Sequence, residues 1–315
     1  MNRVRAWMTL PIVAVLAAAP AWAAGQPATR GRLLVAVTEP DIEAIVVAVG
    51  GDTVDTFSLF KGCIVRKGLQ VEGTVRDRLA KADAVVWTGF FNESAAINDA
   101  AGRRPGSPKP SAPPPAWIDV SKGAARVNVP GSTCFGYVDA GLMAGDPFFW
   151  LNPQNGPVIA RNIANGLGTL HPDKRAVYLA NAEAFRRTLE KDIARWKLAL
   201  KPLAGIRIFS AQCGWQNFSR LGGLRFGVCK GEPGTLPTPQ ILLSHVRDMK
   251  VDIVMVDPNT PHEYGDAFRE LSGVPVIEVA SSIEHIAGAK TYSALFDNLT
   301  QALVKSAGDR KQARN

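Results

Sequence analysis

The chain has 315 residues, 46% of them hydrophobic and 20% charged, with 29 Gly, 22 Pro and a formal net charge of +8. This composition excludes collagen-like, coiled-coil and wholly disordered proteins, and the length suggests about two domains. The basic residues are spread along the chain, without a block of Lys and Arg interleaved with aromatic residues. We therefore expect no nucleic acid among its partners.

The N-terminus has the pattern of a secretory signal peptide. Arg3 and Arg5 precede an apolar run from Ala6 to Pro20, and A-W-A follows at residues 21–23. Charged, apolar and A-x-A regions in this order are typical of a peptide that is removed on export. The alternative, an uncleaved anchor, is disfavoured because the run is shorter than the ~20 residues that span a bilayer. We expect residues 1–23 to be cleaved and the protein to be exported to a bacterial periplasm.

Strands and helices are predicted to alternate after this segment. Apolar runs at Leu33–Val37, Val54–Phe57 and Ala84–Trp87 predict strands, and helical patterns occur at Asp41–Val49 and Arg76–Lys81. Such alternation indicates a parallel α/β sheet. Six prolines between residues 103 and 115 then predict an exposed, semi-rigid loop.

Residues 173–200 predict one long amphipathic helix. Apolar side chains recur there at four- and three-residue steps with charged residues between them: Phe185, Leu189, Ile193, Trp196 and Leu200. Pro172 suits the first turn of such a helix. At 1.5 Å per residue its length is roughly 40 Å, which exceeds one small domain. The helix is therefore expected to link two lobes.

The alternation resumes after Pro202. The predicted strands are Arg207–Ser210, Leu224–Cys229, Ile253–Val256 and Val276–Val279, and the predicted helices are Pro239–Met249, Tyr264–Leu271 and Ala289–Lys305. The fold class is thus α/β, with two parallel-sheet lobes (31–165 and 204–310), a linking helix (171–202) and a cleft between the lobes. Ligands of open α/β sheets bind at the carboxyl ends of the strands, so we expect the site in that cleft.

Several segments resemble a known family. Val49–Val54 (V-G-G-D-T-V), Leu79–Val86 and Thr291–Leu299 are similar to stretches of the metal-binding solute-binding proteins of zinc and manganese ABC importers, the TroA-like family. Asp146–Asn155 (D-P-F-F-W-L-N-P-Q-N) resembles that family's D-P-H-x-W-L-D-P-x-N motif. The resemblance covers nearly all of the chain after the signal peptide. It implies a periplasmic binding protein, a monomer, that serves the permease of an ABC importer.

The resemblance also implies a metal site of three His and one carboxylate, drawn from both lobes. Neutral imidazoles and a carboxylate suit Zn²⁺ or Mn²⁺. At the matching positions this chain has other residues: Arg66 or Lys67, Phe148, Gln212, and Ser281 or Ser282. A cation beside the site would also repel a bare metal ion. We therefore expect no site of the three-His type.

Other potential ligands lie near these positions. Cys63 precedes Arg66, Cys213 follows Gln212, and Glu284 and His285 come just after the carboxylate position. Such ligands could hold a transition metal, with zinc, manganese and copper as the candidates, and none of these would be catalytic. The competing interpretation is that the cysteines form disulfides and that His285 lies in an exposed loop.

The four cysteines allow three pairings in an oxidising compartment. We favour one disulfide in each lobe, Cys63 with Cys134 and Cys213 with Cys229. In the competing arrangement Cys63 and Cys213 face each other across the cleft, as a soft-metal pair or an interlobe bond.

Three functional hypotheses remain open. The first is a solute-binding protein of an ABC importer whose metal ion or complex is held by residues unusual for the family. The second is the same fold with a small organic anion or anionic chelate, for which Arg66, Lys67 and Gln212 would supply charge-assisted hydrogen bonds. The third is a non-binding accessory protein whose cleft is closed by Phe148. An enzyme is not expected, since the S-x-x-K sequence at Ser58 lacks companion motifs.

Overall fold

The computed structural model describes residues 31–61, 71–89, 91–102, 115–126, 148–210, 214–227, 238–260 and 262–312. The chain divides into two units, residues 1–31 and 32–315, and all the described helices and strands belong to the second unit. None of the described helices is long and apolar enough to cross a membrane. The expected signal peptide falls outside the described residues and stays a prediction.

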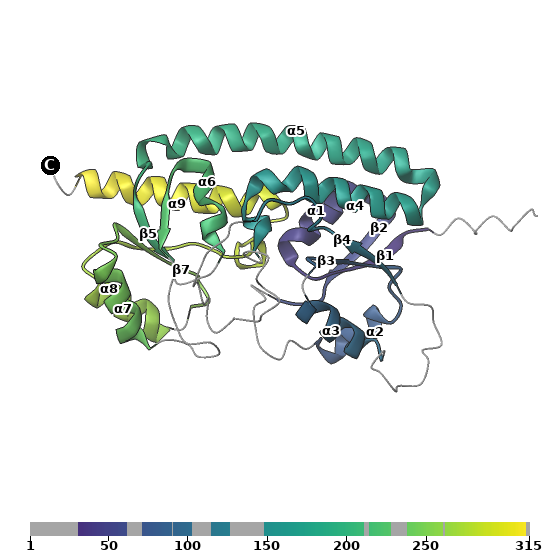
Figure 1. The fold of residues 1–315 in the computed structure, drawn as a ribbon, viewed down its shortest axis with the longest axis horizontal. Helices are drawn as coiled ribbons and strands as arrows, with labels where there is room; N and C mark the ends of the chain where they lie inside the picture. Colours follow the sequence, from purple (N-terminus) through teal and green to yellow (C-terminus); the bar gives the residue numbers. More distant parts are fainter. Residues whose placement is uncertain are drawn as a thin grey trace, which may run out of the picture. The chain divides into compact units, whose positions relative to one another are not determined.

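The first lobe is built on a four-stranded parallel sheet (Figure 1). The strand order is β2-β1-β3-β4, and Val35 lies opposite Ala84 in the register of the two central strands. The strands are β1 (Leu33–Val37), β2 (Val54–Ser58), β3 (Ala84–Trp87) and β4 (Ala116–Asp119). The helices are α1 (Pro40–Gly50), α2 (Gly73–Leu79), α3 (Phe91–Ala100) and α4 (Gly156–Leu170).

The second lobe repeats this arrangement after the long helix α5 (Arg175–Leu200). Its parallel sheet has the order β6-β5-β7-β8, and Phe209 lies opposite Val254 in the central register. The strands are β5 (Arg207–Ser210), β6 (Arg225–Gly227), β7 (Ile253–Val256) and β8 (Val276–Glu278). The helices are α6 (Ser219–Gly222), α7 (Pro239–Asp248), α8 (His262–Leu271) and α9 (Tyr292–Gln312). The predicted α/β class with two parallel-sheet lobes is confirmed, whereas the exact lobe boundaries stay a prediction.

Each sheet separates two apolar clusters, because side chains alternate between the faces of a strand. In β1, Val35 and Val37 belong to one large cluster, whereas Ala36 faces a smaller cluster that includes Leu79 and Ile97 of α2 and α3. In the second sheet, Ile253 and Met255 of β7 belong to the large cluster, whereas Val254 and Val256 belong to a third, smaller cluster. The large cluster contains residues from both lobes, so the lobes share one continuous core.

Helix α5 connects the two lobes, as its amphipathic pattern predicts. Near its N-terminus, Asn181 donates to the carbonyl oxygen of Val49 at 2.9 Å, which ties it to the first lobe. Near its C-terminus, the indole N–H of Trp196 donates to Asp297 of α9 at 2.7 Å. Figure 1 shows α5 as one uninterrupted helix, and it follows a short 3₁₀ turn over Pro172–Lys174.

The sequence patterns miss four elements: α3, α4, α6 and β4. Helix α4 carries three glycines, which lower helix propensity, and it forms because its buried face packs against α5 and α1. Strand β4 has four residues and follows the proline-rich segment, so it offers little pattern to detect. Helix α9 begins at Tyr292 rather than at 289 and continues to Gln312.

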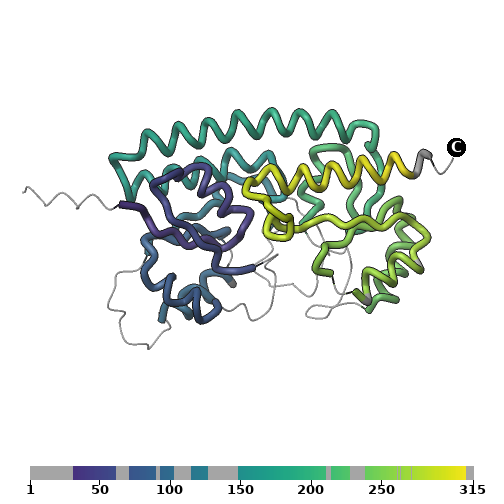
Figure 2. The backbone as a smooth tube through the Cα atoms, turned by 180° about the vertical axis from the view of Figure 1, so that it is seen from behind, coloured from purple at the N-terminus to yellow at the C-terminus, as the bar shows by residue number. Residues whose placement is uncertain are grey.

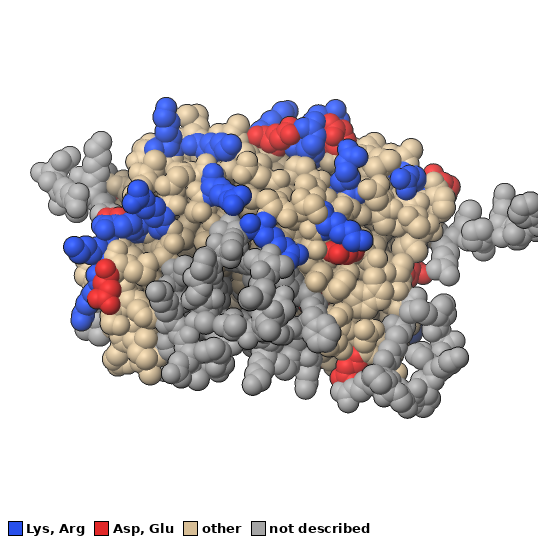
Figure 3. Space-filling view, viewed as in Figure 1, with Lys and Arg blue, Asp and Glu red and all other residues tan. Residues whose placement is uncertain are grey.

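The charges of the second unit are partly paired on its surface. Lys and Arg side chains are scattered over the face shown in Figure 3, with acidic residues among them. On α5, Arg186 bonds to Glu183 and Glu190, and Arg195 lies 2.8 Å from Asp297 of α9. Exposed pairs of this kind contribute little to stability, about 0–1 kcal/mol each.

Two glycines provide a test of the packing between α4 and α5. A Cβ atom on Gly156 would lie 2.3 Å from Leu189 Cδ2, whereas a Cβ atom on Gly308 of α9 would meet nothing within 4 Å. We expect Gly156→Ala to lower the free energy of unfolding by about 1–3 kcal/mol, because the added methyl group would overlap the Leu189 side chain. Gly308→Ala, the matched control, should raise it by about 0.4–1 kcal/mol. Chemical denaturation measures both, and equal effects would contradict this packing.

Candidate functional site

Polar residues gather where the strands of both sheets end. Thr38 and Glu39 follow β1, Thr88 follows β3, and Asp257 follows β7; all four are buried. The segment after β8 contains Ser281 to His285, whose last three residues form the 3₁₀ turn η8 (Ile283–His285). Figure 2 shows this segment and α9 beside helix α1 of the first lobe. Both lobes thus supply polar groups to one region.

Phe148 stands at one of the positions that the motif resemblance assigns to a metal ligand. It is only 1% exposed, and its ring packs edge-on against Trp150 with the centroids 5.4 Å apart. A Cβ atom on Gly214, just after the end of β5, would lie 2.5 Å from Phe148 Cβ, so the two residues touch across the lobes. A phenyl ring offers no lone pair to a metal ion. This position is therefore occupied by apolar packing.

Ser281 and Ser282, at the position predicted for the family's carboxylate ligand, form hydrogen bonds to carboxylates. The amide of Ser281 donates to Asp257 Oδ2 at 2.6 Å, and the hydroxyl of Ser282 donates to Asp41 Oδ1 at 3.3 Å. Both serines are buried. Each therefore connects the segment after β8 to a carboxylate on another element.

His285 lies between two carboxylates of the second lobe. Its Nδ1 is 3.1 Å from Asp257 Oδ2, and its Nε2 is 3.4 Å from Glu284 Oε1. Asp257 is itself fixed by the amides of Ser281 and Asn259. Because a carboxylate only accepts hydrogen bonds, Nδ1 carries a proton and Nε2 faces Glu284. This orientation of a His ring by a carboxylate is typical of metal-binding histidines.

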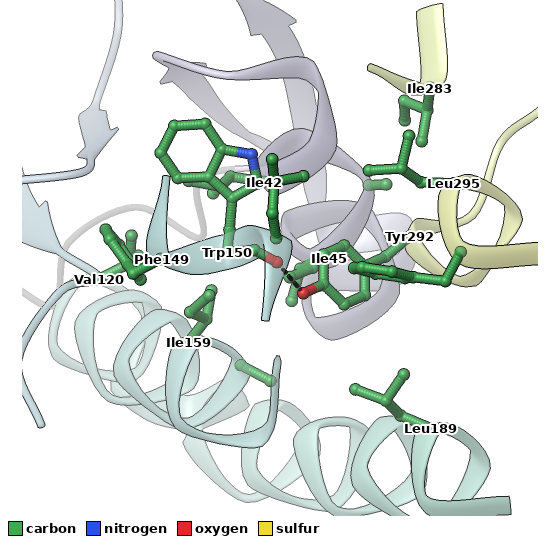
Figure 4. Packing of buried hydrophobic residues seen from close by; sticks show 14 of the residues in the cluster. Ile42, Ile45, Val120, Phe149, Trp150, Ile159, Leu189, Ile283, Tyr292 and Leu295 are labelled. Carbon is green, nitrogen blue, oxygen red and sulfur yellow. Dashed lines mark hydrogen bonds between the residues drawn. The ribbon is translucent and has the colours of Figure 1, made fainter. Parts of the chain in front are cut away.

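Asp41 forms a buried connection from the first lobe to this segment. Its carboxylate accepts hydrogen bonds from the amide of Ile283 at 2.8 Å and from the indole N–H of Trp150 at 3.2 Å. Figure 4 shows Trp150, Ile283 and Tyr292 in this region, with the hydroxyl of Tyr292 donating to the carbonyl oxygen of Trp150. Burial raises the pKa of Asp41 to about 6, although these hydrogen bonds oppose the rise.

Glu39 adds a further buried carboxyl group. Burial raises its pKa well above the usual range, and the nearby charges of Glu93, Asp41 and Glu284 raise it further. Among the described residues, Glu39 Oε1 has no hydrogen-bond partner. Glu93 accepts from the amide of Thr88 at 2.9 Å. The described part of this region is therefore strongly acidic, which favours a cation over an anion.

Several predicted site residues cannot be placed. Arg66, Lys67 and Gln212, and all four cysteines (Cys63, Cys134, Cys213 and Cys229), lie outside the described residues. Within the part of the chain that the structure describes, no three His, Asp or Glu side chains are grouped closely enough to hold a metal ion. The described residues therefore present a pair of potential ligands, Glu284 and His285, rather than a complete set.

The sequence interpretation missed Glu39, Asp41 and Asp257. Each lies within four residues after a predicted strand, at Thr38-Glu-Pro-Asp41 and Val256-Asp257. An acidic residue directly after a buried strand was the available signal, because strand ends of one parallel sheet meet at one edge.

The fold is similar to that of several solved proteins. A crystal structure of ZnuA matches with a TM-score of 0.69 and 20% identity, covering 87% of this chain and 99% of that one. FpvC from Pseudomonas aeruginosa, in complex with Mn²⁺, gives 0.69 and 19%, covering 89% and 99%. The periplasmic zinc-binding protein TroA from Treponema pallidum gives 0.67 and 17%, covering 88% and 99%.

A family assignment follows from the sequence. Residues 35–306 match the family model ZnuA, described as zinc-uptake complex component A, periplasmic, and the chain belongs to this family. The high-affinity zinc uptake system proteins ZnuA of Brucella abortus (strain 2308) and Brucella suis biovar 1 (strain 1330) are each 32% identical over 80 residues. That alignment spans 25% of this chain and only 24% of each relative. The resemblance inferred from the motifs is confirmed.

Proposed function

We propose that this protein is the periplasmic solute-binding component of an ABC importer and that it carries a transition metal ion held by residues unusual for its family. Membership of the ZnuA family supports the role in transport and the periplasmic location, with the importer's permease as partner. The protein acts by binding and release, as a monomer, and not as an enzyme.

The arrangement of Asp257, His285 and Glu284 carries this proposal. When the Nδ1–H of a neutral His285 points to Asp257, Nε2 carries a lone pair that faces Glu284 Oε1. Two such electron-rich atoms require a shared cation, either a proton or a metal ion. Ligands about 2.0–2.1 Å from a tetrahedral ion are about 3.3–3.4 Å apart. The separation of 3.4 Å fits one metal ion bound to both atoms.

The remaining ligands are proposed to be Cys63 and Cys213. Thiolate and imidazole together suit Zn²⁺ or Cu(I), and the carboxylate of Glu284 also suits Zn²⁺ and Mn²⁺. If the cysteines instead form disulfides, the ion keeps water in those positions. Arg66, Lys67 and Gln212 would then hold the anionic part of a metal complex.

Metal analysis of protein purified without a His-tag, followed by titration with Zn²⁺ and Mn²⁺, tests the proposal. We expect His285→Ala and Glu284→Gln each to weaken binding by more than about 100-fold, because even a partner of a ligand is worth about 10–100-fold. Asp257→Ala, which removes such a partner, should cost about 10–100-fold. His262→Ala, an exposed residue of α8, is the matched control and should leave the affinity unchanged. Tight binding that survives the His285 and Glu284 substitutions would contradict the proposed ligands.

The burial of Phe148 favours a second candidate function, a non-binding accessory protein on the same fold. Its ring fills one family ligand position with apolar contacts. Absence of bound metal after purification, together with no measurable affinity for Zn²⁺, Mn²⁺ or Cu(I), would support this alternative. Binding of a small organic anion without metal would instead support the role of Arg66 and Lys67.

A further inference from the structure

Asp41 occupies an unusual position for a carboxylate. It lies in the first turn of helix α1, is only 2% exposed, and accepts three hydrogen bonds from outside its own helix. Oδ1 accepts from the amide of Ile283 at 2.8 Å and from the hydroxyl of Ser282 at 3.3 Å. Oδ2 accepts from the indole of Trp150 at 3.2 Å. Both carboxylate oxygens of Asp41 thus accept hydrogen bonds from residues outside α1.

The donors belong to two separate segments. Trp150 lies in the 3₁₀ turn Phe149–Leu151, which the hydroxyl of Tyr292 at the start of α9 also holds (Figure 4). Ile283 is the first residue of turn η8, whose next two residues are Glu284 and His285. The bond to the Ile283 amide therefore fixes, from the first lobe, the start of the turn that carries the ligand pair.

Burying the Asp41 carboxylate is unfavourable if its only role is to pack the core. The carboxylate is buried, Asp41 is followed in α1 by Ile42 of the large apolar cluster, and the carboxylate lies near the charges of Glu39 and Glu284. Replacing a whole set of buried charged and hydrogen-bonded groups by apolar residues of similar volume is often neutral or stabilising. A carboxylate here is better explained by the geometry that it imposes on its donors.

We propose that Asp41 is a positioning residue for the cation site: it holds turn η8 so that Glu284 Oε1 and His285 Nε2 face one shared ion. This inference rests on the proposed function for the role of the pair, but the hydrogen bond to Ile283 can be tested without any metal. Asp41 does not touch the ion and acts through the backbone of the turn.

Hydrogen exchange of the Ile283 amide and titration with Zn²⁺ test the proposal on three variants of the full chain. Asp41→Ala removes every acceptor. Asp41→Asn keeps an oxygen for the Ile283 amide, and it guards against the case in which the alanine variant fails to fold. Asp52→Ala, an exposed acidic residue in the 3₁₀ turn after α1, is the matched control.

We expect the Ile283 amide to exchange more than about tenfold faster in Asp41→Ala, since a hydrogen bond to a charged group is worth about 1.5–3 kcal/mol. Zn²⁺ affinity should fall about tenfold in the same variant. Asp41→Asn should restore most of both properties, and Asp52→Ala should match the wild type. Recovery by the isosteric asparagine separates positioning of the turn from an effect of charge alone.

Unchanged exchange of the Ile283 amide in Asp41→Ala would overturn the proposal. Faster exchange with unchanged Zn²⁺ affinity would also overturn it, because the turn would then be held without consequence for the ion. If the wild-type protein binds no Zn²⁺, the proposed function fails for that metal. The exchange experiment then decides by itself whether Asp41 holds the turn.

Discussion

Replacing Phe148 by His should lower the free energy of unfolding by about 3 kcal/mol and should not create a zinc site of the family type. The side chain is 1% exposed and packs against Trp150 and Gly214. An imidazole there loses apolar contacts and brings a polar ring into an apolar environment, and both effects destabilise the fold. The other described position that the resemblance assigns to a ligand offers Ser281 or Ser282, whose hydrogen bonds go to carboxylates.

Chemical denaturation and Zn²⁺ titration measure the two effects. Phe185→His is the matched control, because Phe185 lies half-buried on helix α5. It should cost about 1 kcal/mol, since less apolar surface is lost. A Phe148→His variant as stable as the wild type, or one with newly acquired tight Zn²⁺ binding, would show that the ring does not fill the site.

Replacing Glu39 by Gln should raise the free energy of unfolding by more than about 1 kcal/mol at pH 8, because the amide carries no charge and each unit by which the pKa of Glu39 is raised costs the charged carboxylate about 1.4 kcal/mol. Burial, and then Glu93, Asp41 and Glu284, raise the pKa of Glu39. The folded state therefore binds the proton more tightly than the unfolded state, so the wild type gains stability as the pH falls. The glutamine variant lacks this gain. Its advantage should be largest above the raised pKa and should disappear as the pH approaches 4.5, the ordinary value.

Denaturation curves at pH 8, 6.5 and 5 measure this dependence. Asp41, with its pKa raised to about 6, changes stability in the same direction between about pH 6 and its ordinary value of 3.8. Both the wild type and the Glu39→Gln variant should therefore gain some stability from Asp41 at low pH. Glu270→Gln, an exposed position of α8, is the matched control and should change stability by less than about 0.5 kcal/mol. A Glu39→Gln variant that is less stable than the wild type at pH 8 would contradict this account.

Most of the fold can be predicted from local patterns. Strands β1, β3 and β7 are short apolar runs buried on both faces, and α5 has an amphipathic repeat over its whole length. These signals come from neighbouring residues. Helix α4 shows the limit, because its glycines argue against a helix and its stability comes from packing against α5.

The candidate site is less predictable because its contacts join distant residues. Glu284 and His285 stand out by residue type, but the partner of His285 is Asp257, 28 residues earlier. Asp41 and Ile283 are separated by 242 residues. No spacing along the chain indicates such a contact. The acidic character of the region therefore emerges only when strand ends of both sheets are brought together.

The continuous core limits how far the two lobes can move apart. Phe148, Trp150 and Trp215 are each at most 3% exposed, and all belong to the cluster shared by the lobes. Exposing three such rings to water costs about 6 kcal/mol, at about 2 kcal/mol each. At about 1.4 kcal/mol per factor of ten, only about one molecule in ten thousand would be widely open at any moment. Under the proposed function, a bound ion would therefore leave from a rare open state or through work done on the protein by the importer's permease.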